Sequence, residues 1–288
     1  GKAMTTQPFD LVVIGGGPGG YAAAEGAARL GARVCVIERD GWGGTCTHRG
    51  CVPTKALLAC SGAFAALKRL QRLGIATGEA AFDFSAMKRH QAQTVRISAL
   101  GVRSALEAAG AVLRSGTGRP ISPDTVSCTD ADGRTEILHA RNICLAWGSE
   151  PLLPPGVVPS PRILTSDGFL ALPTLPERVA VVGGSVIGVE FATLLAELGC
   201  RVTLWELMDR LIPAEDRDLS DFLAQALNRL GVEIRTGVRM TAIAEDRDGV
   251  TITAEPAGGP SAAREGETRP LRWHGSCCLL ASGRRPRL

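Results

Sequence analysis

Two cysteines five positions apart carry the chemistry to which this sequence is best suited. Cys46 and Cys51 lie in the segment from Gly43 to Lys55, which also contains Gly44 and Gly50. A dithiol that passes two electrons needs one exposed sulfur to attack a substrate disulfide and a second sulfur close to an electron donor. Glycines allow the backbone to come close to a cofactor. The segment therefore predicts a redox-active cysteine pair beside a bound cofactor.

A helix is expected to begin near the second cysteine. Pro53 suits the first turn of a helix, where its missing N–H costs little, and the apolar run 56–70 would continue that helix. The helix dipole would then favour the thiolate of Cys51. The alternative is a buried or metal-binding pair, but a zinc site usually has a second Cys or His pair at short spacing. The remaining cysteines are scattered, so we expect no metal site.

The residues before the cysteines have the pattern of a βαβ dinucleotide-binding unit. The apolar run 9–14 predicts a buried parallel strand, and it leads into a glycine-rich turn and an alanine-rich helix. A second strand, 33–37, ends at an acidic residue. In such a unit the glycines shape the turn, admit a pyrophosphate and let the helix pack on the strand, while the acidic residue binds ribose hydroxyls. These positions are Gly15, Gly17, Gly20 and Glu38.

The same unit recurs in the second half of the chain. A strand at 179–182 leads into the turn 183–188 and a helix, and a further strand, 201–204, precedes Glu206. The acidic residue follows the first glycine by 23 positions in both copies, since 38 − 15 and 206 − 183 are equal. Two nucleotide sites are therefore expected. The fold class is predicted to be α/β, with two Rossmann-like dinucleotide-binding domains in three layers.

The second fingerprint departs from the first at its middle position. Ser185 replaces glycine there and places a Cβ and a hydroxyl where the backbone would meet the pyrophosphate, so we expect weaker or displaced binding. The Glu206 carboxylate can accept a hydrogen bond from a free ribose 2′-hydroxyl, and its negative charge repels a 2′-phosphate. The nearest following cation is Arg210. NAD is therefore favoured over NADP.

A proline-rich connection at 149–156 is the expected domain boundary. It divides the chain into a first domain, 1–150, with the cysteine pair, and a second domain, 151–288. We expect a long helix at 84–109 and a single strand at 137–145 in the first domain. The second domain is expected to contain an amphipathic helix at 216–230 and a strand at 232–235.

Composition fits an α/β protein of this size. The chain has 288 residues, of which 45% are hydrophobic and only 4% aromatic, and can bury two cores. We expect no nucleic-acid partner, because the net charge of +3 comes without a basic stripe. We also expect no membrane partner, because no apolar run is long enough to span a bilayer and no signal-peptide pattern is present. Nine cysteines without framework spacing favour a reducing, cytoplasmic location.

With these motifs the chain resembles the class I pyridine nucleotide–disulfide oxidoreductases, and most closely the dihydrolipoyl dehydrogenases. The resemblance covers nearly all of the sequence. It depends on the cysteine segment, both fingerprints and the Ala-Ser-Gly-Arg-Arg-Pro run at 281–286, in the family's order. The family uses FAD and NAD, so the resemblance implies electron transfer between a dithiol or disulfide, such as dihydrolipoamide, the cysteine pair, FAD and NAD.

The resemblance also implies roles for single residues. Cys51 would be the sulfur against the flavin, and Cys46 would exchange with the substrate. Lys55 and Glu190 would form the family's ion pair near the flavin and nicotinamide. The family's FAD contacts would fall on Gly15, Gly17, Gly20, Glu38, Thr45, Lys55, Gly116 and Gly148. Its NAD contacts would fall on Gly183, Ile187, Gly188, Glu190, Glu206, Val238 and Gly283.

Two short segments depart from the family pattern. Trp147 stands between Ala146 and Gly148, where the family usually has threonine, and a bulky indole there is expected to alter flavin packing. Between the cysteines, Thr47 and His48 replace the common Leu-Asn. We expect His48 to be a loop histidine and not the catalytic base.

Members of the family continue past the Gly-Arg-x-Pro run with a second flavin-domain segment and a dimerisation domain, which carries an acid–base His-Glu pair. None of the four histidines here lies in a matching motif. We therefore expect a chain that lacks the dimerisation domain, has an incomplete FAD domain and retains FAD less well. A full-length form would be a homodimer.

Two alternatives stay open. A mercuric-reductase-like metal reductase is the second interpretation within the enzymes, since members of that group also tolerate serine in the second fingerprint. In a different class, the chain would be a truncated, non-catalytic nucleotide-binding fragment without an acid–base histidine. Turnover of lipoamide separates these interpretations.

Overall fold

The computed structural model describes residues 7–258, 271–281 and 284–286. Two compact units share these residues. Of the described residues, the first unit comprises 7–53, 91–150 and 286, and the second comprises 54–90, 151–258, 271–281 and 284–285. The chain thus passes from the first unit to the second at Pro53, within a long helix, as well as at Glu150.

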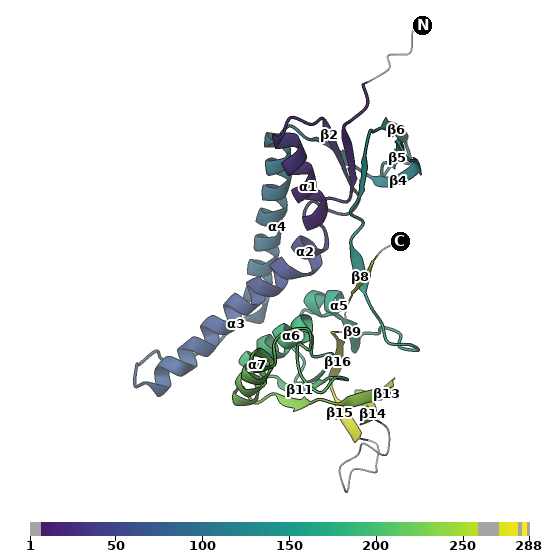
Figure 1. Cartoon of the computed structure of the whole chain (residues 1–288). Coiled ribbons are helices and arrows are strands. Elements are labelled where there is room, and N and C mark those ends of the chain that lie inside the picture. Colours follow the sequence, from purple (N-terminus) through teal and green to yellow (C-terminus); the bar gives the residue numbers. More distant parts are fainter. Residues whose placement is uncertain (1–6, 259–270, 282–283, 287–288) are drawn as a thin grey trace. The chain divides into compact units, whose positions relative to one another are not determined.

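A four-stranded parallel sheet forms the centre of the first unit, with helices on one face and an antiparallel sheet on the other (Figure 1). The parallel strands, in sheet order, are β3 (Val112–Ser115), β2 (Val34–Glu38), β1 (Leu11–Ile14) and β7 (Ile143–Leu145). The helices of this layer are α1 (Pro18–Arg29) and the part of α4 (Phe84–Ala108) that follows His90. The antiparallel strands are β4 (Thr117–Ser122), β5 (Thr125–Thr129) and β6 (Thr135–His139).

The alternation of side chains along β1 explains these three layers. Successive residues of a strand point to opposite faces of the sheet. Val13 packs with Ala24 and Leu106 in the core on the helical side, whereas Val12 and Ile14 pack in the core that includes residues of β5 and β6. Both faces of β1 are therefore covered, which is why the strand is apolar throughout.

The second unit repeats this plan. Its five-stranded parallel sheet has one core shared with helices and another shared with an antiparallel sheet. The parallel strands, in sheet order, are β12 (Glu233–Arg235), β11 (Arg201–Trp205), β10 (Arg178–Val182), β16 (Cys277–Leu280) and β9 (Ile163–Thr165). The helices are α5 (Ser166–Ala171), α6 (Val186–Glu197) and α7 (Arg217–Arg229), and the antiparallel strands are β13 (Val238–Glu245), β14 (Val250–Pro256) and β15 (Leu271–Gly275). A two-stranded pair, β8 (Ser149–Pro151) with β17 (Arg284–Pro286), completes the sheets.

Two consecutive helices carry the cysteine segment, α2 (Gly44–Arg49) and α3 (Cys51–Arg72). Leu57 and Phe64 of α3 are buried in the helical-side core of the second unit. By length and mean hydropathy of 1.4, the stretch Gly44–Arg72 is apolar enough to cross a membrane, so the expectation that no stretch meets this criterion is wrong. This is weak evidence for a membrane span, because core helices of other proteins have the same length and hydropathy. In this structure 33% of the most apolar 18 residues of the stretch are buried.

The predicted strand at 137–145 is also wrong in its extent. The chain forms two strands there, because residues 140–142 take it from the antiparallel sheet at β6 into the parallel sheet at β7. Other predicted elements are confirmed to within a residue or two, including the helix α4 and the helix α7.

Candidate functional site

The first glycine-rich turn has the shape of a phosphate cradle. Gly15 has φ of +109°, and a Cβ there would lie 2.1 Å from the carbonyl oxygen of Ala146. A Cβ on Gly20 would lie 1.8 Å from the carbonyl oxygen of Gly15. At Gly17, by contrast, the nearest atom to an added Cβ is the Cα of Gly44, 3.7 Å away. Protein packing thus requires glycine at positions 15 and 20, whereas at position 17 the described residues would tolerate a Cβ. Glycine at position 17 is therefore not explained by packing, which is the expectation where a pyrophosphate approaches the N-terminus of α1.

The acidic residue that ends β2 is held by backbone donors. Glu38 Oε2 accepts a hydrogen bond from the Gly16 N–H at 2.7 Å, and Oε1 accepts one from the Asp40 N–H at 2.7 Å. The Gly116 N–H donates to the Glu38 carbonyl at 2.9 Å. A Cβ on Gly116 would lie 2.5 Å from the carbonyl oxygen of Thr129. Gly116 therefore lies beside Glu38, and its lack of a side chain already has a packing explanation.

The cysteine segment lies directly on this turn. The Gly43 N–H donates to the Gly16 carbonyl at 2.9 Å. A Cβ on Gly44 would lie 2.7 Å from the Cα of Gly17. Gly148, with φ of +76°, is close to Thr45, since an added Cβ would lie 3.9 Å from the Thr45 Oγ1. The structure thus brings together all FAD-contact candidates of the first unit around one turn.

The two cysteines lie on either side of Gly50, which interrupts the helical stretch. Cys46 is in α2 and is half-buried, and Cys51 is the first residue of α3 and is exposed. Gly50 separates the helices, and a Cβ there would lie 3.4 Å from the Cα of Cys46. The backbone just before Cys51 therefore lies close to Cys46. The predicted position of Cys51 at a helix N-terminus is confirmed.

Lys55 and Glu190 form the predicted ion pair. Lys55 Nζ donates to Glu190 Oε1 at 2.5 Å. The Lys55 side chain is 58% exposed and that of Glu190 is 23% exposed. Exposed pairs of this kind contribute about 0–1 kcal/mol to stability, so the pair matters more for where it places charge. Lys55 lies four residues after Cys51, on the same face of α3.

The second glycine-rich turn reproduces the first. Gly183 has φ of +109°, and a Cβ on Gly188 would lie 1.8 Å from the carbonyl oxygen of Gly183. Glu206 Oε2 accepts from the Gly184 N–H at 2.6 Å, and Oε1 accepts from the Met208 N–H at 2.8 Å. The remaining candidates of this unit are Ile187, which packs against the core, Val238, whose N–H donates to the Glu206 carbonyl at 3.1 Å, and Gly283, which lies outside the described residues.

The serine of the second turn, Ser185, forms a hydrogen bond that could not be predicted from the sequence. Ser185 has φ of −70° and ψ of 176°, close to the φ of −77° and ψ of −176° of Gly17. Its hydroxyl donates to the Ala281 carbonyl at 2.9 Å. The hydroxyl is therefore engaged by the protein, and the Cβ is the remaining difference from glycine at this position.

The cation nearest to Glu206 in sequence is also engaged. Arg210 donates to the carbonyl oxygens of Pro213 and Glu215 at 2.7 and 2.8 Å. A guanidinium held by two backbone carbonyls is not available to pair with a ribose 2′-phosphate without breaking those bonds. The charge that faces the second nucleotide position is thus that of Glu206.

The two departures noted in the sequence have structural roles. Trp147 is half-buried and packs against the core on the antiparallel side of the first unit. The expectation that His48 is a loop histidine is wrong, because the residue lies in the short helix α2. Its Nε2 forms a hydrogen bond with the Trp42 carbonyl at 3.0 Å, which connects the cysteine segment to the loop after β2. Sequence analysis missed Trp42 and the donors Gly16 and Gly184. The repeated Gly-Gly pair before each acidic residue was the available signal for the donors.

The structure has two Rossmann-type units, and in the first the cysteine segment contacts the glycine-rich turn. This combination is typical of dinucleotide-dependent oxidoreductases. The chain belongs to the pyridine nucleotide-disulphide oxidoreductase family, which matches over residues 9–288. The predicted family and fold class are thereby confirmed.

Several known proteins are similar to the chain. It is 38% identical to the dihydrolipoyl dehydrogenase of Chlamydia pneumoniae over 248 residues, which are 86% of this chain and 53% of that protein. It is 35% identical to the dihydrolipoyl dehydrogenase of Chlorobaculum tepidum, over 96% of this chain and 57% of that protein. The chain thus spans about half the length of the curated relatives it matches.

Solved structures show the same fold. LpdA from Mycobacterium tuberculosis is 28% identical, with a TM-score of 0.82 over 96% of this chain and 59% of that chain. The copper(II) complex of the HOCl-induced flavoprotein disulfide reductase RclA from Escherichia coli is 26% identical, with a TM-score of 0.77 over 98% of this chain and 58% of that chain.

Proposed function

We propose that this chain is the dinucleotide-binding part of an FAD-dependent disulfide oxidoreductase that acts as a dihydrolipoyl dehydrogenase. The main support for the proposal is the contact between the cysteine segment and the first glycine-rich turn. The Gly43 N–H donates to the Gly16 carbonyl, and Gly44 lies against Gly17. This arrangement supports a redox pair beside the first dinucleotide. The relatives named dihydrolipoyl dehydrogenase support the substrate class.

The residues around the first turn would hold FAD. Glu38 would bind the adenosine ribose, and the N-terminus of α1 above Gly17 would face the pyrophosphate. When bound, FAD supplies two-electron exchange between a dithiol and a nicotinamide. The exposed side chain of Cys51 would face the flavin, and Lys55 would place a positive charge one helical turn away.

Cys46 would perform the exchange with substrate. One thiolate of dihydrolipoamide attacks the Cys46 sulfur of the oxidised pair, so that a mixed disulfide forms and Cys51 leaves as a thiolate. The second substrate thiol then attacks the substrate sulfur of the mixed disulfide, which releases oxidised lipoamide and the Cys46 thiolate. Two electrons remain on the cysteine pair. The acid–base group for these proton transfers would come from outside the described residues, in a homodimeric full-length protein.

The second unit would bind NAD in preference to NADP. The Glu206 carboxylate is fixed by the Gly184 and Met208 N–H groups, and it would accept hydrogen bonds from a free ribose 2′-hydroxyl. The engagement of Arg210 by backbone carbonyls supports the same preference.

The visible spectrum of the purified chain, followed by anaerobic addition of NADH, tests the proposal. We expect flavin bands that bleach, together with a long-wavelength thiolate-to-flavin band that the variant Cys51→Ser lacks. A chain that binds no FAD when FAD is added, or whose flavin NADH does not reduce, would contradict the proposal. Cys46→Ser is the matched variant, which should keep the flavin and lose lipoamide turnover in the full-length protein.

A metal reductase is the second candidate, because a structural neighbour was solved as a copper(II) complex. NADH oxidation that depends on added Cu(II) or Hg(II), and not on lipoamide, would favour this candidate.

A further inference from the structure

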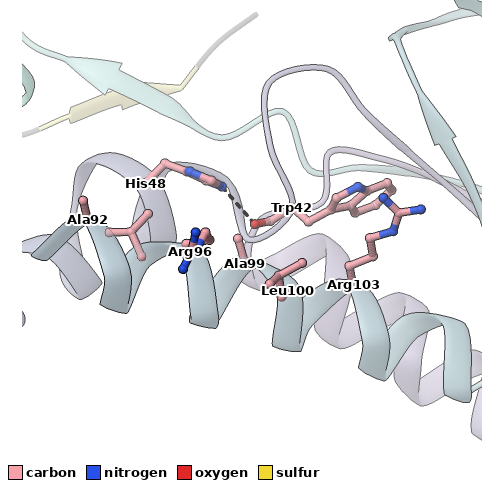
Figure 2. Close-up of a pocket in the computed structure, with 8 residues that line it drawn as sticks. Trp42, His48, Ala92, Arg96, Ala99, Leu100 and Arg103 are labelled. Atoms are coloured by element: carbon pink, nitrogen blue, oxygen red, sulfur yellow. Dashed lines mark hydrogen bonds between the residues drawn. The ribbon is translucent and has the colours of Figure 1, made fainter. Parts of the chain in front are cut away.

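A groove on the first unit lies beside the cysteine segment. It has a volume of about 360 Å³ and is lined by Trp42, by His48 and by one face of α4. Figure 2 shows His48 above the N-terminal part of this face and Trp42 near Arg103 at the other end. Of the described residues predicted to contact FAD or NAD, none lines this groove.

The floor of the groove is a regular stripe of α4. The lining positions 92, 95, 96, 99, 100 and 103 follow the three- and four-residue spacing that places side chains on one face of a helix. Alanines at 92 and 99 leave the floor hollow, while Leu100 is 58% exposed. The stripe thus offers an apolar surface that a flat molecule can cover.

The walls of the groove are fixed by the protein. The ring of His48 is hydrogen-bonded to the Trp42 carbonyl at 3.0 Å, as drawn in Figure 2. It also lies against Gly41, where an added Cβ would be 2.6 Å from the His48 Nε2. Trp42 itself packs against the core on the helical side of the unit. Both aromatic side chains are therefore positioned before any ligand binds.

The groove carries positive charge. As far as the structure describes the chain, its lining includes two guanidinium groups and no carboxylate. Arg103 donates through Nε to Glu107 at 2.9 Å. Within the part of the chain that the structure describes, Arg96 has no hydrogen-bond or ion-pair partner. Arg96 is thus the cation that is available to an anion.

We propose that this groove binds a planar aromatic anion. The ring of the ligand lies on Ala99 and Leu100 against the Trp42 indole, and its carboxylate, sulfonate or phosphate group pairs with Arg96. Indole rings stack on aromatic ligands, and guanidinium groups bind planar or tetrahedral oxyanions through two parallel hydrogen bonds. Because His48 lies between the two cysteines, such a ligand contacts the redox segment without occupying either dinucleotide position.

Fluorescence titration of the purified chain with 8-anilinonaphthalene-1-sulfonate tests this site. We expect one dye per chain, with Arg96→Gln and Leu100→Gln each raising the Kd by about fivefold or more. The matched controls are Arg89→Gln and Ile97→Gln on the same helix, which should change the Kd less than about twofold. Ile97 is 59% exposed and Leu100 is 58% exposed, but Ile97 does not line the groove.

Two further measurements make the result decisive. The neutral dye N-phenyl-1-naphthylamine, which lacks the sulfonate, should bind Arg96→Gln and the unmodified chain with equal affinity. Trp42→Phe should lower the energy transfer from tryptophan to the bound sulfonate dye, because Trp42 lines the groove. Equal sulfonate affinity in all variants, or unchanged energy transfer in Trp42→Phe, would overturn the proposal. Circular dichroism of each variant, with Leu100→Ala as a milder change, shows that the fold is retained.

Discussion

Lys55 and Glu190 meet through a hydrogen bond of 2.5 Å although 135 positions separate them in the sequence. Lys55 lies one helical turn after Cys51 in α3, and Glu190 lies in the first part of α6, directly after the second glycine-rich turn. Lys55 is thus part of the helix that begins at Cys51, and Glu190 is part of the helix that follows the second glycine-rich turn. The pair places a charged group of the cysteine helix against a charged group of the helix that would face the nicotinamide nucleotide.

Replacement of this lysine should affect electron transfer more than stability. For Lys55→Met we expect a loss of no more than about 1 kcal/mol in the free energy of unfolding, because the side chain is 58% exposed. We expect the anaerobic rate of flavin reduction by NADH to fall by about tenfold or more, since a positive charge near the reacting groups is lost. Stopped-flow absorbance measures this rate. The control Lys68→Met, on the same helix, should leave the rate unchanged; equal rates in both variants would remove the assigned role of Lys55.

The glycines of the first turn should separate folding from cofactor binding. Gly20→Ala places a Cβ 1.8 Å from the Gly15 carbonyl oxygen, so we expect it to destabilise the chain by about 3 kcal/mol or more. The added Cβ of Gly17→Ala meets no atom of the described residues closer than 3.7 Å. We expect its urea unfolding curve to match that of the unmodified chain within about 0.5 kcal/mol, while its FAD affinity falls by at least about tenfold. Unimpaired FAD binding by Gly17→Ala would show that the pyrophosphate lies elsewhere.

Sequence patterns predicted the repeated βαβ units well because their information is local. The strands next to Gly15 and Gly183 are apolar on both faces, and the turns need glycine for steric reasons that act within a few residues. The engagement of Ser185 by Ala281 and of Arg210 by backbone carbonyls could not be predicted, since these contacts depend on segments that only the fold brings close. For the same reason, the sequence did not predict that the residues after Pro53 belong to the second unit. No local signal marks a boundary between units inside a continuous helix.

The serine of the second turn gives a test of what limits NADH binding. Ser185→Gly removes both the Cβ and the hydroxyl, and Ser185→Ala removes only the hydroxyl that donates to Ala281. If the Cβ holds the pyrophosphate away from the backbone, Ser185→Gly should lower the Kd for NADH by about threefold to tenfold, and Ser185→Ala should not. Each variant should lose about 1 kcal/mol of stability with the hydrogen bond. Isothermal titration calorimetry measures the Kd, and equal Kd values for both variants would assign no role to the Cβ.

The buried thiols should make the chain less stable at alkaline pH. Burial raises the pKa of Cys277 from 9.0 to about 12, and it does the same for Cys35. Between pH 9 and 12 the unfolded chain releases these protons while the folded chain keeps them, so each thiol stabilises the fold below pH 9 and loses that contribution as the pH rises toward 12. The expected slope is about 1.4 kcal/mol per pH unit for each thiol.

Urea unfolding with reductant at pH 8, 9 and 10 checks this slope. Lysine and tyrosine titration affects all variants alike, so the informative quantity is the difference between the unmodified chain and Cys277→Ala. That difference should shrink as the pH rises from 9 to 10, because only the unmodified chain loses the contribution of this thiol. The control Val179→Ala, on the strand that pairs with Cys277, removes a buried side chain that does not titrate and should show a constant difference. A constant difference for Cys277→Ala as well would mean that burial of this thiol does not control the alkaline limit of the fold.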